Sequence, residues 1–196
     1  MDIMQKLFPK WLIAYLFVLW PIVIFCLITL MTGKACISYK GFAIDGDSNI
    51  YLAKDGVIDV LNPQGEILRT ISPYTTRDYK FTLTSDNTIR ICTGDYIYQT
   101  DLSGNLISKK ELSDSTLDER IEMSRHKYVA SNGTVYTMKN SLLRTYIYRM
   151  DGAQRTVVYQ MPIFDYVVKV LAIVSFLSFI IVVPICIITS RKSVPT

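Results

Sequence analysis

Residues 42–71 read FAIDGDSNIYLAKDGVIDVLNPQGEILRTI, and this stretch decides the fold of the middle of the chain. Four short runs rich in β-branched and aromatic residues are separated by three clusters of turn residues, at 45–49, 54–56 and 62–65. This alternation predicts a four-stranded antiparallel sheet in which each strand pairs with the next along the chain. One such sheet cannot bury both of its faces, so it requires neighbouring sheets.

The chain supplies two further copies of this pattern, at 79–111 and 128–160. Their third strands, YIYQTD at 96–101 and YIYRMD at 146–151, match each other closely and align with VIDVLN of the first copy. Repeats of roughly 40–50 residues with four strands each are typical of propeller blades. We therefore predict three four-stranded antiparallel propeller-type sheets within 38–160.

The first repeat, 42–71, resembles a blade of the NHL-type and related six-bladed β-propellers in its turn chemistry and its alternation, which FAIDGDSNIYLA and VIDVLNPQGEIL carry. The resemblance covers the three repeats and neither hydrophobic end of the chain. A charged insertion at 112–127 separates the second repeat from the third. The resemblance implies an interaction platform, although some such propellers are lyases or hydrolases. None of that family's catalytic residues can be placed on this chain.

Hydrophobic segments flank the repeats, and their longest uncharged runs cover 11–33 and 170–190. A helix of about 20 apolar residues crosses the hydrocarbon core of a bilayer. We therefore predict transmembrane helices at 11–33 and 162–190. A cleaved signal peptide explains the first segment less well, because the run is longer than a signal's apolar region and no small-residue cleavage pattern follows it.

Basic residues lie in both tails, 1–10 and 191–196. Such residues favour the cytoplasmic side, and long loops cross the membrane largely regardless of their charge. We predict a two-pass protein of the cell membrane, with both termini in the cytoplasm and the central domain outside it.

The net charge of +4 comes without a basic stripe, so we expect no nucleic acid partner. Two of the four cysteines, Cys36 and Cys92, lie between the predicted helices. They either form a disulfide, if the domain faces an oxidising compartment, or stay as two thiols.

Asp45, Asp47 and Asn49 have the spacing of the first ligands of a calcium loop. The match then fails, because Ile50 stands where glycine is required and Gly56 where a bidentate glutamate belongs. A hairpin turn rich in Asp and Asn explains the same residues. With one histidine and no catalytic motif, the chain is predicted to be non-enzymatic and to bind no metal or cofactor.

Two strands carry paired tyrosines, Tyr96 with Tyr98 and Tyr146 with Tyr148. Because side chains alternate along a strand, both tyrosines of each pair point to one face. The pairs are candidates for partner binding, or they form an aromatic ladder between sheets. Alternation alone does not separate these interpretations.

Asp165 and Lys169 lie four residues apart where the second helix begins. This spacing places both on one side of a helix. We predict an ion pair at the membrane interface, since a charge in the bilayer centre is far costlier.

The preferred function is a non-enzymatic, membrane-anchored binding or assembly subunit of a membrane protein complex. The alternatives are a ligand-capturing or gating subunit of an oligomeric channel or transporter, and an enzyme whose site forms only on assembly. An open stack of three sheets would leave the outer faces of its first and last sheets, including 57–61 and 156–159, uncovered. The predicted partners are therefore the lipid bilayer and either further copies of the chain or a larger membrane protein.

Overall fold

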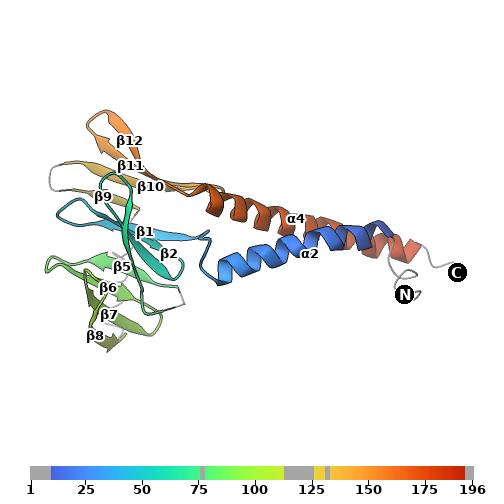
Figure 1. Cartoon of the computed structure of the whole chain (residues 1–196), viewed down its shortest axis with the longest axis horizontal. Coiled ribbons are helices and arrows are strands. Elements are labelled where there is room, and N and C mark those ends of the chain that lie inside the picture. Colours follow the sequence, from blue (N-terminus) through green and yellow to red (C-terminus); the bar gives the residue numbers. More distant parts are fainter. Residues whose placement is uncertain (1–9, 76–77, 113–125, 131–132, 193–196) are drawn as a thin grey trace. The chain divides into compact units, whose positions relative to one another are not determined.

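The computed structural model describes residues 10–75, 78–112, 126–130 and 133–192. The chain divides into two compact units (Figure 1). One unit combines Met1–Ala35 with Ile163–Thr196, and the other is Cys36–Pro162. Most of the predicted tails and of the predicted insertion at 112–127 lies outside the described residues.

The first unit is a pair of helices, α2 (Lys10–Met31) and α4 (Ile163–Lys192). The helices run antiparallel, because the Tyr15 hydroxyl donates to Ser178 Oγ at 2.8 Å while Cys26 packs with Val168. They begin and end within two residues of the ranges expected from the sequence. Pro21 and Pro184 lie inside them without ending them.

Both helices are long and apolar enough to cross a membrane, with windows of mean hydropathy 2.6 and 2.2. Only a small share of those windows is buried within the structure. Large apolar side chains therefore point outward, including Phe17 at 79% exposure and Phe176 at 66%. Exposed patches of this kind require an apolar surrounding or a partner.

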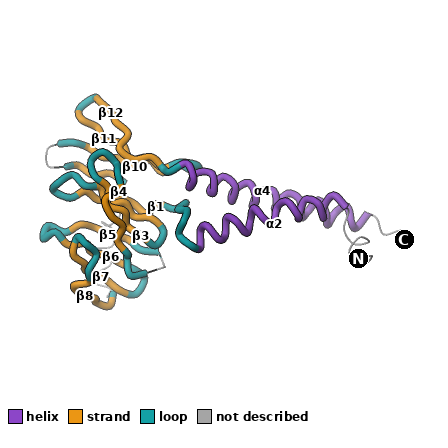
Figure 2. The backbone as a smooth tube through the Cα atoms, in the orientation of Figure 1, coloured by secondary structure: helices purple, strands orange, loops and turns teal. Residues whose placement is uncertain are grey.

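The second unit contains three sheets of four antiparallel strands, each strand pairing with the next in the chain (Figure 2). The observed strands match the three predicted repeats closely. The first sheet is β1 (Tyr39–Ile44), β2 (Ile50–Lys54), β3 (Val57–Leu61) and β4 (Ile67–Ile71). The second sheet is β5 (Lys80–Leu83), β6 (Thr88–Cys92), β7 (Tyr96–Asp101) and β8 (Leu106–Glu111). The third sheet is β9 (Lys127–Val129), β10 (Val135–Asn140), β11 (Thr145–Asp151) and β12 (Gln154–Gln160).

The first sheet lies between the other two, so the order in space is third, first, second. One of its faces forms a core with the second sheet, through Tyr51, Ile58 and Val60 against Phe81 and Ile91. Its opposite face is buried as well, on the side of the third sheet. The expectation that 57–61 would form an uncovered outer face is therefore wrong, because the third repeat returns to cover the first.

Two hairpin turns fix how closely the sheets approach. Gly65, between β3 and β4, has φ +89°, and a Cβ there would lie 1.9 Å from the carbonyl oxygen of Val158 in the third sheet. Gly104, between β7 and β8, has φ +93°, and its Cβ would meet Ile71 of the first sheet at 2.7 Å. Only glycine satisfies both the backbone conformation and the space at these two contacts.

Candidate functional site

The tyrosine pair of the second sheet belongs to an internal junction. Tyr98 packs against the core between the first and second sheets, and Tyr74 stacks on its ring at 5.9 Å between centroids. Lys109 Nζ lies 3.7 Å from the centroid of the Tyr96 ring and covers it. Tyr98 thus takes part in the junction between the first and second sheets, whereas Tyr96 is covered by a lysine of its own sheet.

The tyrosine pair of the third sheet lies on the opposite side of its sheet. Tyr146 and Tyr148 stack on each other, with ring centroids 5.8 Å apart and planes inclined by 28°. Ile147 between them is fully buried on the other face, toward the first sheet. Both tyrosine rings are half-buried, and among the described residues no other sheet covers them.

Strand pairing identifies the other residues of this face. Tyr148 pairs with Thr137 on one side and Val157 on the other, and Met150 pairs with Val135 and Arg155. We call this surface the open aromatic face. It consists of Lys127, Val129, Val135, Thr137, Lys139, Tyr146, Tyr148, Met150, Arg155 and Val157.

Apolar side chains on the open aromatic face are strongly exposed. Val129 is 59% exposed, Val157 50% and Met150 38%. Arg155 lies over the Tyr148 ring with its guanidinium carbon 3.5 Å from the centroid. An exposed aliphatic and aromatic surface rimmed by cations is typical of an interaction site.

The other two sheets show what normally covers this face. In the aligned third strands, Tyr148 corresponds to Asp59 of the first sheet and Tyr98 of the second. Asp59 is buried toward the third sheet, and Tyr98 packs toward the first. This face of the first sheet is thus covered by the third sheet, and this face of the second sheet is covered by the first. Among the described residues, no sheet covers this face of the third sheet.

A cleft of about 500 Å³ lies where the first strands of the three sheets meet. Its lining combines hydroxyls, an amide and the Asp45 carboxylate with several apolar side chains, and it includes no Lys or Arg. The lining residues are Phe42, Ala43, Ile44, Asp45, Gly46, Phe81, Thr82, Leu83, Thr84, Ser85, Asn87, Leu102 and Tyr128.

The Asp45 carboxylate in this cleft is engaged by its own turn. One oxygen accepts the backbone N–H groups of Asp47 and Asn49, and the other accepts the Asn49 amide. The turn thus uses the side chains of Asp45 and Asn49 and the backbone of Asp47, the three residues that resembled the start of a calcium loop. His126, the one histidine, is exposed, and its carbonyl accepts the N–H of Met138.

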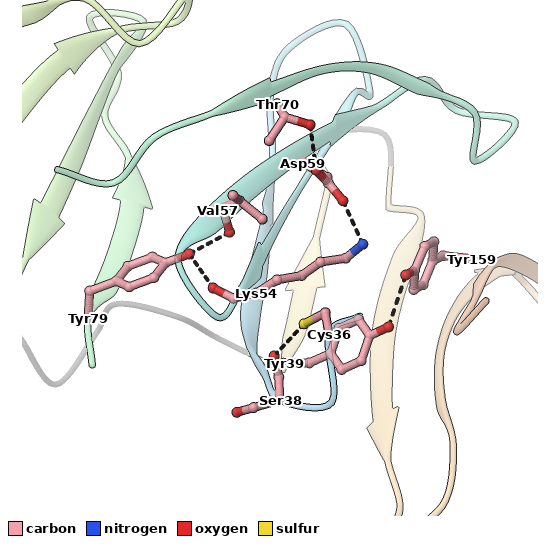
Figure 3. A network of polar contacts seen from close by, with 9 residues as sticks. All are labelled: Cys36, Ser38, Tyr39, Lys54, Val57, Asp59, Thr70, Tyr79 and Tyr159. Atoms are coloured by element: carbon pink, nitrogen blue, oxygen red, sulfur yellow. Dashed lines mark hydrogen bonds and ion pairs between the residues drawn. The ribbon is translucent and has the colours of Figure 1, made fainter. Parts of the chain in front are cut away.

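A buried polar network joins the first and third sheets (Figure 3). Lys54 Nζ lies 2.6 Å from Asp59 Oδ2, with both side chains 8% exposed. The Thr70 hydroxyl donates to the other Asp59 oxygen at 2.8 Å. The Tyr39 and Tyr159 hydroxyls are 3.1 Å apart, and Lys54 lies within 6 Å of both ring centroids.

Burial and pairing oppose each other at Lys54. Burial lowers the pKa of the ammonium, but the electrostatic interaction with Tyr159 and the hydrogen bond to Asp59 outweigh it and raise the pKa above its ordinary value. Tyr79 borders the same region and donates to the carbonyls of Lys54 and Val57. Burial raises the pKa of the Tyr79 hydroxyl strongly, so it remains a hydrogen-bond donor.

Cys36 and Cys92 are two separate thiols in this structure. Cys36 Sγ donates to the carbonyl of Ser38 at 3.2 Å, while Cys92 Sγ donates to that of Thr93 at 3.6 Å. Cys36 precedes β1 of the first sheet and Cys92 ends β6 of the second, and the two thiols are not joined. Burial raises the pKa of the Cys36 thiol, which makes it less reactive.

Asp165 and Lys169, the predicted ion pair at the membrane interface, lie in the first turns of α4. Asp165 is buried and Lys169 is half-buried. Their spacing places both residues on one side of α4, and the ion pair stays a prediction.

Sequence reasoning missed Arg155 and the Lys54–Asp59 pair. Arg155 lies in strand β12, QRTVVYQ. The register between β11 and β12 shifts between Ile147 and Tyr148, so alternation along β12 alone does not show that Arg155 shares a face with Tyr148. Lys54 ends β2 beside a hairpin turn, where charges are normally solvated, and Asp59 lies in the middle of β3.

Comparisons with known proteins add little to this site. No family model matches the chain, and no curated protein matches it. Among solved structures it is similar to a protein of unknown function from Bacteroides caccae, at 11% identity and a TM-score of 0.32. That match covers 63% of this chain, which spans less than half of the other chain, 45% of its length.

Proposed function

We propose that the chain is a non-enzymatic, membrane-anchored binding or assembly subunit of a membrane protein complex. The open aromatic face is the observation that carries this proposal. Two repeats bury the corresponding face against another sheet, whereas the third exposes stacked tyrosines and valines. Exposed patches of this composition mark sites where a protein partner docks.

The helices support the membrane anchor. Their outward side chains are apolar along their length, and the basic residues of the tails favour the cytoplasm. In this topology both termini are cytoplasmic and the sheets lie outside the cytoplasm. The partner meets the open aromatic face there, above the bilayer.

The sheets act as part of a β-propeller. Four-stranded meanders whose first strands meet at a common cleft are the arrangement of propeller blades. Propellers close with about 4–8 blades, so three sheets leave an open arc that requires further surface from elsewhere. A second copy of the chain or a larger membrane protein supplies it.

Replacing both tyrosines of the open aromatic face tests this function. The Tyr146→Ser, Tyr148→Ser variant is expressed in native membranes, extracted in mild detergent and sized beside the wild-type chain. We expect the wild-type chain to migrate in a larger complex and the double variant to migrate alone. The matched control is Tyr74→Ser, which removes an exposed tyrosine on the junction between the first and second sheets. If the double variant stays in the same complex as Tyr74→Ser, the open aromatic face is not the docking surface.

The central cleft favours a second candidate, a ligand-capturing or gating subunit of an oligomeric channel or transporter. Its volume of about 500 Å³ is within the range of small-molecule sites, about 300–1,000 Å³. Its lining offers hydroxyl, amide and carboxylate groups without a cation, which suits an uncharged polar ligand better than an anion. Flux through vesicles reconstituted with the purified complex tests this candidate, and no flux above that of empty vesicles would reject it.

A further inference from the structure

The open aromatic face carries charge of one sign. Lys127, Lys139 and Arg155 belong to it by strand pairing, and all three are exposed. The described strands place no Asp or Glu on it. Asp151 is the nearest carboxylate along β11. It forms an ion pair with Arg149, and the side chain of Arg149 belongs to the opposite face of the sheet.

The tyrosines orient two arginines. Arg155 of this face stacks over the Tyr148 ring, and Arg144, which directly precedes β11, donates from Nη1 to the Tyr146 hydroxyl at 3.2 Å. A stacked guanidinium keeps its N–H edge available for a carboxylate, which it binds through two parallel hydrogen bonds. Apolar valines surround these groups, and the contact with a partner would desolvate them.

A second copy of the chain does not supply the matching charge. The complementary surface in a closed ring would be the second sheet's face that points away from the first sheet. Strand pairing places Lys80, Arg90 and Lys110 on that face, with Asp101 as its carboxylate. Asp101 already accepts the backbone and side-chain N–H groups of Asn105. Joining the two faces would bring like charges together, which costs binding energy.

From this we infer that the open aromatic face docks an acidic surface of a different protein, with carboxylates opposite Lys139 and Arg155. The inference rests on the proposed assembly function and specifies the partner's chemistry. A protein surface fits better than a flexible polyanion, because the same face of the first and second sheets is covered by another sheet. The partner protein packs on the third sheet as a further sheet would. Its carboxylates supply the negative charge that the open aromatic face itself lacks.

Photo-crosslinking in native membranes tests the inference. A benzophenone amino acid replaces Thr137, whose neighbour across the strand pair is Tyr148, in the full-length chain. We expect a crosslinked product with another protein, whose crosslinked peptide contains Asp or Glu. The Lys139→Glu, Arg155→Glu variant should lower the yield roughly tenfold or more, since like charges then oppose each other.

Two controls separate charge from folding. The Lys139→Arg, Arg155→Lys variant keeps both charges and should retain the product. Lys110→Glu reverses a charge on the second sheet and should also retain it. Should the double reversal fail to fold, the wild-type chain gives an independent result, because raising the salt concentration should lower its crosslink yield.

Each outcome has a definite meaning. A product that survives both the charge reversal and high salt overturns the acidic-partner inference but leaves the assembly function standing. A product with a second copy of this chain, with lipid or with nucleic acid also overturns the inference. The absence of any product at Thr137 overturns the inference and the proposed function together.

Discussion

Removing the Asp59 carboxylate tests whether the buried polar network holds the first and third sheets together. The Asp59→Asn variant leaves the Lys54 ammonium beside a neutral amide, where the pair was 2.6 Å apart and 8% exposed. Removing one partner of a buried ion pair costs about 3–5 kcal/mol. The rings of Tyr39 and Tyr159 still contact the ammonium, so we expect the lower end, about 3 kcal/mol. In a domain of this size that lowers Tm by about 10 °C.

Thermal and urea unfolding of the full chain in mild detergent measures this loss, followed by the near-ultraviolet circular dichroism of the tyrosines. The Lys54→Met, Asp59→Leu variant removes both charges and should unfold within about 2 kcal/mol of the wild type. The matched control is Asp151→Asn, which breaks an exposed ion pair with Arg149 and should cost less than about 1 kcal/mol.

The reasoning would be refuted if Asp59→Asn proved as mild as Asp151→Asn. It would also be refuted if the double variant were as unstable as the single one. In either case the buried charge of Lys54 would not be what destabilises the domain.

Three further predictions concern stability and topology. Because pairing raises the folded-state pKa of Lys54, its contribution to stability is fully present below about pH 10.4 and should be lost as the pH rises further, which unfolding at pH 9 and 11.5 measures. Gly65→Ala, with its Cβ 1.9 Å from the backbone of the neighbouring sheet, should destabilise the domain by more than about 2 kcal/mol, whereas Gly152→Ala, at positive φ in open space, should cost about 1 kcal/mol; equal losses would reject the role of the close approach. A cysteine at Ser103 should react with an impermeant thiol reagent in intact cells and one at Ser193 should not, and the reverse pattern would reject the extracytoplasmic placement.

The strands were predictable because each is bounded by turn residues with a defined backbone role. Asp45, Asn62 and Asp101 each accept the N–H of a residue further along their turn, so the sequence marks where each hairpin reverses. The helices were predictable because an apolar run of about 20 residues without charges is typical of a helix that can cross a membrane.

The order of the sheets in space was not predictable from local pattern. Turn chemistry and alternation act within one repeat, whereas the packing of the third sheet on the first depends on contacts between residues far apart in the chain. Tyr39 with Tyr159 and Gly65 with Val158 are such contacts. The same packing decides that Tyr98 lies in a junction and Tyr148 on an open face, although the two strands read almost alike.

The native mass of the chain extracted from membranes in mild detergent is the decisive test of the assembly function. The open aromatic face predicts a complex heavier than one chain with its detergent, whose partner dissociates when Tyr146 and Tyr148 are replaced by serine. A stable, non-aggregating wild-type monomer at micromolar concentration, with no bound protein, would contradict it.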